Sequence, residues 1–175
     1  MTRIFLLSFK AKQRIAAIAL LALGVTFEYL SRKSKALKDE IAGWEEGRVF
    51  ALSVMRDGPS VSLKKENGAI RYLGYGLKDS DITFYFKNID SALMVFVGMM
   101  GAHTASIQHR TIVHGDLGKA MEVLRAMNIV QMYLFPGIVL KTTFKRPPKM
   151  SFGQLLLKAW VMIRLTPGLI AAAGR

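Results

Sequence analysis

The sequence predicts an α+β domain, with an antiparallel meander sheet of about five strands covered on one face by helices and an additional helix at each end of the chain. Two observations lead to this fold class. Segments that alternate apolar and polar residues follow one another from residue 48 to residue 86, separated by turn-forming pairs such as Asn67-Gly68. Two apolar helical segments come after them. A chain of 175 residues has the size of one domain.

Composition narrows the function. The chain has no cysteine, which excludes disulfides, cysteine nucleophiles and thiolate metal sites. It is 51% apolar, which predicts either an enclosed apolar ligand or contact with a membrane. The net charge of +13 favours an anionic partner, and the excess lies at the two ends. Residues 1–40 carry 8 basic and 3 acidic side chains, residues 41–116 carry 8 and 8, and residues 117–175 carry 9 and 1.

Residues 1–44 are predicted to form a basic and apolar helical extension. Lys10, Lys12 and Arg14 precede the uncharged run 15–27, whose alanines and leucines favour a helix. The run is shorter than the roughly 20 residues of a membrane span, and Glu28 ends it. We expect a helix that packs on the domain or lies in a membrane interface, with a cleavable leader as the alternative. A charged connecting helix follows over residues 31–44.

Residues 45–135 are predicted to form the central domain. Strands are expected over residues 48–55, 60–64, 69–75 and 82–86, because apolar residues alternate there between turn signals. Asn88 or Asp90 can cap the next helix, in which residues 92–100 have no charged or polar side chain. A helix that is apolar all round must be covered all round, by the sheet on one side and by a second helix layer or a ligand on the other.

The end of the central domain has clear boundaries. A short helix is expected over residues 102–109 and a last strand over residues 111–114. Asp116 is a good N-cap for a helix that ends at Phe135, before Pro136-Gly137. Residues 136–175 are predicted to form a basic extended segment and a final apolar helix, Phe152 to Leu165, which packs on or caps the domain.

This order of elements resembles the sterol carrier protein 2 family. The stretch Ser80-Asp81-Ile82-Thr83-Phe84 is similar to the family's strand of alternating hydroxyl and apolar residues, and Ile112 to Leu117 is similar to its strand, Gly-Asp, helix corner. The resemblance covers about residues 45–135 and consists of structural motifs. It implies a lipid bound in an apolar tunnel between sheet and helices, with no catalytic residue. The additional ends leave the class of lipid open.

The predicted lipid-binding residues lie on the fourth strand, on the apolar helix after it and on the helix after Asp116. Methionine is abundant among them, and its flexible thioether suits a cavity of irregular shape. A plain hydrophobic core is the alternative interpretation. The set comprises Phe84, Phe86, Leu93, Met94, Phe96, Val97, Met99, Met100, Ile107, Met121, Leu124, Met127, Met132 and Phe135.

The basic ends are predicted to contact an anionic membrane surface, because basic residues beside apolar runs and a tryptophan are typical of a membrane interface. The residues concerned are Lys10, Lys12, Arg14, Lys141, Lys145, Arg146, Lys149 and Trp160. Nucleic-acid binding by the basic tail is a weaker alternative, since Phe144 is the only aromatic residue between its basic residues. A solvated basic face without a specific partner is a third.

Other chemistry lacks a signature in the sequence. His103, His109 and His114 share no helical face, so no metal site is predicted. Residues 115–119 lack the first glycine and the hydroxyl residue of a phosphate-binding loop. We therefore expect no cofactor and no catalysis. The sequence predicts a cytoplasmic protein that binds or transfers a fatty acid, sterol-like, acyl or isoprenoid lipid, with peripheral attachment to the inner face of the membrane as one option. An accessory protein that presents lipid or quinone intermediates to membrane-bound enzymes is the alternative.

Overall fold

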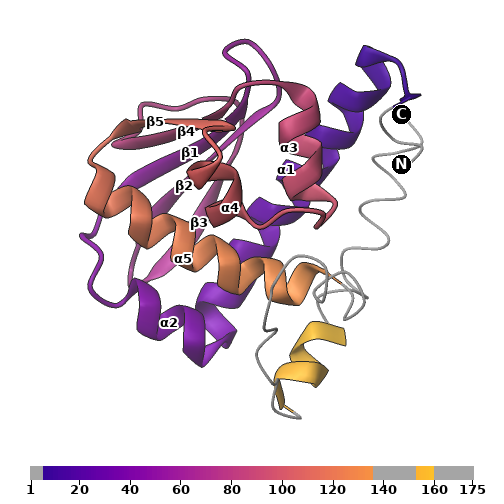
Figure 1. The fold of residues 1–175 in the computed structure, drawn as a ribbon. Helices are drawn as coiled ribbons and strands as arrows, with labels where there is room; N and C mark the ends of the chain where they lie inside the picture. Colours follow the sequence, from indigo (N-terminus) through magenta and orange to yellow (C-terminus); the bar gives the residue numbers. More distant parts are fainter. Residues whose placement is uncertain (1–5, 136–152, 160–175) are drawn as a thin grey trace.

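The computed structural model describes residues 6–135 and 153–159, and Figure 1 shows their arrangement. A five-stranded sheet has one face covered by helices, so the α+β class is confirmed. Residues 153–159 form a separate short helix. The elements, in chain order, are α1 (Phe9–Lys33), α2 (Lys35–Ile41), β1 (Val49–Val54), β2 (Ser60–Glu66), β3 (Ala69–Tyr75), β4 (Ile82–Phe86), α3 (Ile89–Phe96), α4 (Ala102–Ile107), β5 (Thr111–Gly115) and α5 (Leu117–Leu134).

The sheet is mixed rather than a continuous antiparallel meander. Its strand order is β3-β2-β1-β4-β5. The β1-β2-β3 meander and the β4-β5 pair are antiparallel as expected, but β4 lies beside β1 and runs parallel to it, with Leu52 opposite Phe84. The connection from β3 to β4 therefore has to cross β2 and β1, and it does so on the face of the sheet that the helices do not cover.

Small side chains make room for this crossover. Ser62 Oγ donates to the carbonyl of Gly76 and accepts from the backbone N–H of Lys78, both on the crossover. Ser62 lies opposite Ala51 in the β1-β2 register, and both are fully buried although they point away from the helices. At the far end, the backbone N–H of Val49 donates to the carboxylate of Asp81. Larger residues at these positions would lift the crossover from the sheet.

Helix α1 belongs to the hydrophobic core of the domain. Its buried side chains include Leu20, Phe27 and Leu30, and the Phe27 ring meets the Phe50 ring of β1 at 5.5 Å between centroids. The helix is long and apolar enough to cross a membrane by length and composition, but half of its most apolar window is buried inside the domain. Core helices pass the same test. Helix α1 therefore packs on the domain, which is one of the two arrangements expected for the N-terminal helix.

Two polar side chains of α1 bind the edge strand β3. Ser31 Oγ accepts a hydrogen bond from the backbone N–H of Ile70 at 3.0 Å, and the Glu28 carboxylate accepts one from the backbone N–H of Tyr72 at 3.1 Å. Edge strands otherwise present unpaired donors and acceptors to other chains. Glu28 interrupts the apolar run of the sequence because its carboxylate is needed as the acceptor for a backbone N–H of β3.

The predicted Gly-Asp corner between β5 and α5 has a steric cause. Gly115 has φ +104°, and a Cβ atom there would lie 2.0 Å from the carbonyl oxygen of Asp81. Only glycine fits that space and that backbone conformation. The Asp116 side chain then accepts from the backbone N–H of Lys119, which confirms Asp116 as the N-cap of α5. Asn88, rather than Asp90, caps α3 by accepting from Ser91.

Candidate functional site

The apolar layer between the sheet and the helices holds six of the fourteen predicted lipid-binding residues. All six are buried in the core: Phe84, Phe86, Leu93, Leu124, Met127 and Phe135. They come from β4, α3 and α5 and the residue after it, as expected. All of them except Phe135 belong to one hydrophobic core cluster, in which α1 packs against α3 and α5. Their role in lining a ligand site stays a prediction.

The remaining predicted residues form the margin of this layer. Met94, Phe96, Val97, Met100, Met121 and Met132 are partly buried. Met99 and Ile107 are 44% and 66% exposed. The predicted set therefore runs from the surface to the centre of the core. The margin contacts the core at Phe96, whose half-buried ring meets the buried Phe86 ring with 5.2 Å between centroids.

The turn between α3 and α4 shapes this margin. α3 ends at Phe96, and the backbone N–H groups of Met99 and Met100 both donate to the carbonyl of Met94. Gly98 adopts φ +75°, a conformation that favours glycine, and so reverses the chain. The stretch 91–109 contains no Asp, Glu, Lys or Arg. Apolar side chains thus stand at the surface of the domain without a charged residue between them in the sequence.

The apolar helices α3 and α5 do not form the simple two-walled cavity that the sequence predicted, and α3 is shorter than the apolar run 92–100 suggested. α3 packs against α1 and α4, and α5 also packs against α1 and α4. Figure 1 shows α4 between α3 and α5, with α1 behind them. Helix α1 of the N-terminal region packs on β3 and β2 and against α3 and α5, and residue patterning within 45–135 cannot reveal this.

The short helix 153–159 lies against the end of α5. Lys158 Nζ donates to the carbonyl oxygen of Met132 at 2.9 Å, and partial burial lowers the pKa of this lysine below its usual value. Leu157 packs against the core, whereas Leu155 and Leu156 are about half exposed. Part of the expected final helix is therefore seen on the domain, next to the methionines at the end of α5.

Of the residues predicted to contact a membrane, only those at the start of α1 are described. Lys10 and Arg14 are exposed, and Lys12 forms an ion pair with Asp90 at 2.7 Å. Leu6 and Phe9 beside them are exposed apolar residues. Lys141, Lys145, Arg146, Lys149 and Trp160 lie outside the described residues. The start of α1 combines exposed cations with exposed apolar side chains, which is the pattern of an interfacial helix end.

Two hollows near this end of the domain were not predicted. One, of about 420 Å³, lies between the start of α1 and the turn after β1 and is lined by Arg14, Pro59 and Tyr75 among others. Another, of about 540 Å³, lies on the face of the sheet away from the helices and includes Tyr85, Ile112 and His114. The alternation of residues along β4 and β5 indicates that these three side chains share one face, and this is the sequence pattern from which the hollow could have been inferred.

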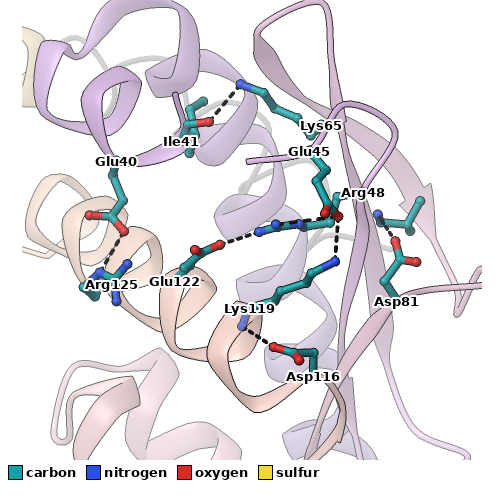
Figure 2. A network of polar contacts seen from close by, with 11 residues as sticks. Glu40, Ile41, Glu45, Arg48, Lys65, Asp81, Asp116, Lys119, Glu122 and Arg125 are labelled. Atoms are coloured by element: carbon teal, nitrogen blue, oxygen red, sulfur yellow. Dashed lines mark hydrogen bonds and ion pairs between the residues drawn. The ribbon is translucent and has the colours of Figure 1, made fainter. Parts of the chain in front are cut away.

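The opposite end of the sheet carries a network of paired charges (Figure 2). The buried guanidinium of Arg48 donates to Glu122 of α5 and stacks over the Trp44 ring at 5.3 Å. Lys119 donates to Glu45, which lowers the pKa of that carboxyl below its usual value. The side chains of this network bridge α2, α5 and the sheet. Because these charged side chains pair with one another, we assign the network a structural role.

Within the described parts of the chain, no three His, Asp or Glu side chains come together in a way that could hold a metal ion. His103 lies on α4 and His109 in the turn after it, whereas His114 is on β5, where its ring contacts the Tyr85 ring at 5.1 Å between centroids. The contact of His114 is with an aromatic neighbour across the strand pair.

Comparison with known proteins gives structural likeness without a sequence family. No protein-family model matches the chain, and no curated protein matches it. Solved structures that it resembles include a UbiJ-SCP2 ubiquinone synthesis protein, with 16% identity, TM-score 0.47, and coverage of 75% of this chain and 99% of that one. A crystal structure of sterol carrier protein 2 has 17% identity, TM-score 0.48, and coverage of 65% and 93%. A sterol carrier protein domain of Helicoverpa armigera has 14% identity, TM-score 0.43, and coverage of 62% and 84%. Each of these TM-scores is below 0.5, and the family resemblance expected from the sequence stays a prediction.

Proposed function

We propose that this protein binds a lipid or another long apolar molecule at the margin of its helix layer, next to a membrane, and that its role is binding rather than catalysis. The observation that supports this most directly is the contact between the half-buried Phe96 ring and the buried Phe86 ring, three residues before the exposed Met99. Both Phe96 and Met99 lie in a stretch of the sequence without charged residues.

Ligand entry requires side chains that yield without unfolding the domain. Met94, Met99 and Met100 are unbranched and flexible, and they lie where α3 turns toward α4. If an acyl chain displaced these methionine side chains, the acyl chain could reach Phe96. Each square ångström of apolar ligand surface then buried contributes roughly 25 cal/mol before ordering costs. Few polar groups are needed, so selectivity among lipid head groups should be modest.

The membrane part of the proposal rests on the uneven distribution of charge. At the end of the domain where α1 begins, Lys10, Arg14, Arg56 and Lys87 are exposed, and the acidic residues there are Asp57 and Asp90. Five other acidic side chains belong to the opposite end shown in Figure 2: Glu40, Glu45, Asp81, Asp116 and Glu122. An anionic bilayer would attract the basic end, where the exposed Leu6 and Phe9 can enter the interface.

The ligand proposal is tested with the full chain, by native mass spectrometry with lipid extraction and by uptake of a fluorescent fatty acid. We expect bound lipid or uptake in the parent protein. Met99→Glu places a charge on the entry path at an exposed site and should reduce uptake at least about tenfold, a loss of about 1.4 kcal/mol. Leu117→Glu is the control, because Leu117 is also an exposed apolar residue but stands at the start of α5.

The outcome against the ligand proposal is equally specific. A parent protein that carries no lipid and takes up no fatty acid would contradict it, as would full uptake by a folded Met99→Glu variant. Lipid-free protein that still floats with vesicles and co-purifies with biosynthetic enzymes would instead support the accessory alternative, in which the protein presents lipid or quinone intermediates to membrane-bound enzymes.

Membrane attachment is tested by flotation with vesicles of phosphatidylcholine alone and with one quarter phosphatidylglycerol. We expect binding to the anionic vesicles that weakens with salt, and a clear loss in Lys10→Glu/Arg14→Glu. The matched control is Lys33→Glu/Lys38→Glu, which makes the same charge change at exposed positions on α1 and α2 away from the basic end. Equal losses in both variants would show a response to net charge alone and refute a specific membrane-facing end.

A further inference from the structure

The helix-free face of the sheet is covered over only part of its width. The crossover from β3 to β4 lies over β2 and β1, where Ser62 binds it. Beyond it, the outward side chains of β4 and β5 border the hollow of about 540 Å³ that includes Tyr85, Ile112 and His114. This volume is in the range of small-molecule sites. The hollow and the lipid margin lie on opposite faces of the sheet, and Phe86 at the end of β4 borders both.

One wall of the hollow is apolar and aromatic. Tyr85 and Ile112 lie directly opposite each other in the β4-β5 register, and the Tyr85 and His114 rings meet edge to face at an interplanar angle of 66°. Ile112 is 46% exposed, and Met55 at the end of β1 is 38% exposed. A ligand with a flat ring or a short apolar body would cover these side chains and gain from their burial.

The other wall is cationic. Arg56 and Lys87 line the hollow, and no carboxylate does. Asp57, the acidic residue next in sequence to Arg56, lines the separate hollow beside α1. Among residues 6–135 and 153–159, neither Arg56 nor Lys87 takes part in an ion pair. Both cations are therefore available to an anionic group, for which guanidinium and ammonium are suited donors.

The backbone holds the two cations side by side. The N–H of Met55 donates to the carbonyl of Phe86 at 2.9 Å, so the residues that follow each of them, Arg56 and Lys87, leave the sheet at the same place. Met55 has φ +62°, which is uncommon for a residue other than glycine, and Ser53 Oγ stabilises this conformation by donating to the Met55 carbonyl at 2.8 Å. The left-handed conformation of Met55 and its hydrogen bond to Phe86 thus place Arg56 beside Lys87 at the cationic wall.

We propose that this hollow is a second ligand site, for a small organic anion in which a phosphate group is attached to a flat or apolar body. Arg56 and Lys87 bind the phosphate, and Tyr85, Ile112 and Met55 contact the body. The ligand can be a free aryl phosphate or the phosphate end of a lipid, since both present the same chemistry. The site faces away from the helix layer and does not depend on the lipid-binding proposal.

The test measures binding to the full-length protein by isothermal titration and by amide chemical-shift changes. The probes are phenyl phosphate, phenol, inorganic phosphate and dihexanoylphosphatidic acid. We expect phenyl phosphate to bind more tightly than either phenol or inorganic phosphate. Arg56→Gln/Lys87→Gln should weaken it at least about tenfold, and Ile112→Asn should reduce it to the level of inorganic phosphate. Tighter binding of dihexanoylphosphatidic acid than of phenyl phosphate would support a lipid head group as the source of the anion, and the reverse order a free aryl phosphate.

The control variant is Lys33→Gln/Lys38→Gln, which removes the same charge from exposed positions far from the hollow and should leave binding unchanged. All substituted side chains are exposed, and thermal melting verifies that each variant folds. Phenyl phosphate that binds no better than inorganic phosphate, or that binds equally well after Arg56→Gln/Lys87→Gln, would overturn the proposal. Fatty-acid uptake should be unchanged by that double variant, which separates failure of this site from failure of the proposed lipid site.

Discussion

Gly24 of α1 and Tyr72 of β3 are so close that a Cβ atom on Gly24 would lie 2.6 Å from Cδ2 of the Tyr72 ring. The contact lets the helix approach the edge strand closely enough for the hydrogen bonds that Glu28 and Ser31 accept. A glycine inside a helix costs about 1 kcal/mol relative to alanine, so close packing must offset that cost here.

Gly24→Leu should therefore destabilise the domain by about 1–3 kcal/mol, because the new side chain overpacks the contact with Tyr72. Urea unfolding followed by circular dichroism measures the change. Gly43→Leu is the matched control, since a Cβ atom there meets nothing within 4 Å. If both variants lose the same stability, the closeness of α1 and β3 is not what requires glycine at position 24.

Ser31→Ala should destabilise the domain by about 1–3 kcal/mol, because it leaves the buried backbone N–H of Ile70 without its acceptor. Thr26→Val provides the comparison on the same helix. The Thr26 hydroxyl is equally buried but has no hydrogen-bond partner among the described residues, so its replacement should be neutral or stabilising. If both variants lost the same free energy of unfolding, the contribution of Ser31 to stability would come from packing and not from its hydrogen bond to β3.

Glu122→Ala should lower the free energy of unfolding by about 1.5–3 kcal/mol, because it removes a charged hydrogen-bond acceptor from the buried guanidinium of Arg48. Asp39→Ala breaks the exposed pair with Lys35 on α2 and should cost only about 0.3–0.5 kcal/mol. Thermal and urea unfolding of both variants give the comparison. A Glu122 variant as stable as the Asp39 variant would contradict a structural role for this ion pair.

The pairing of Glu45 with Lys119 predicts a pH dependence of stability. The hydrogen bond and charge of Lys119 lower the pKa of Glu45 below 4.5, so the pair contributes fully above that pH and its contribution is lost as pH falls through the folded pKa. The melting temperatures of the parent and of Glu45→Gln should thus differ most near pH 6 and converge toward pH 3. Because the pair is exposed, the difference should also shrink with salt. A constant difference across this pH range would refute the assignment.

Local patterns predicted the strands well. Ala69–Tyr75 and Ile82–Phe86 begin and end where alternation and turn residues place them, and Asp116 caps α5 as expected. The pairing of β4 with β1 could not be read in this way, because it joins residues such as Leu52 and Phe84 through backbone bonds that no local sequence pattern encodes. The small residues Ala51 and Ser62 on the outer face are the part of the sequence that reflects the crossover, because they leave room for it.

The same distinction applies to the sites. The apolar residues of α3 and α5 could be named from the sequence, but the packing of α1 against both helices and the sheet depends on contacts such as that of Phe27 with Phe50. The hollow with Arg56 and Lys87 depends on the parallel strand pair and on the left-handed backbone of Met55, a conformation that is rare for methionine. Neither feature has a sequence signature.

The attachment of α1 to β3 also sets the order in which the chain can fold. Ser31 and its partner Ile70 are 39 residues apart, so a ribosome releases the apolar helix well before the strand that receives it. During that interval Leu20, Phe27 and Leu30 have no sheet to cover them. The newborn chain is therefore vulnerable to aggregation before β3 emerges, and α1 can close the sheet edge only after that point.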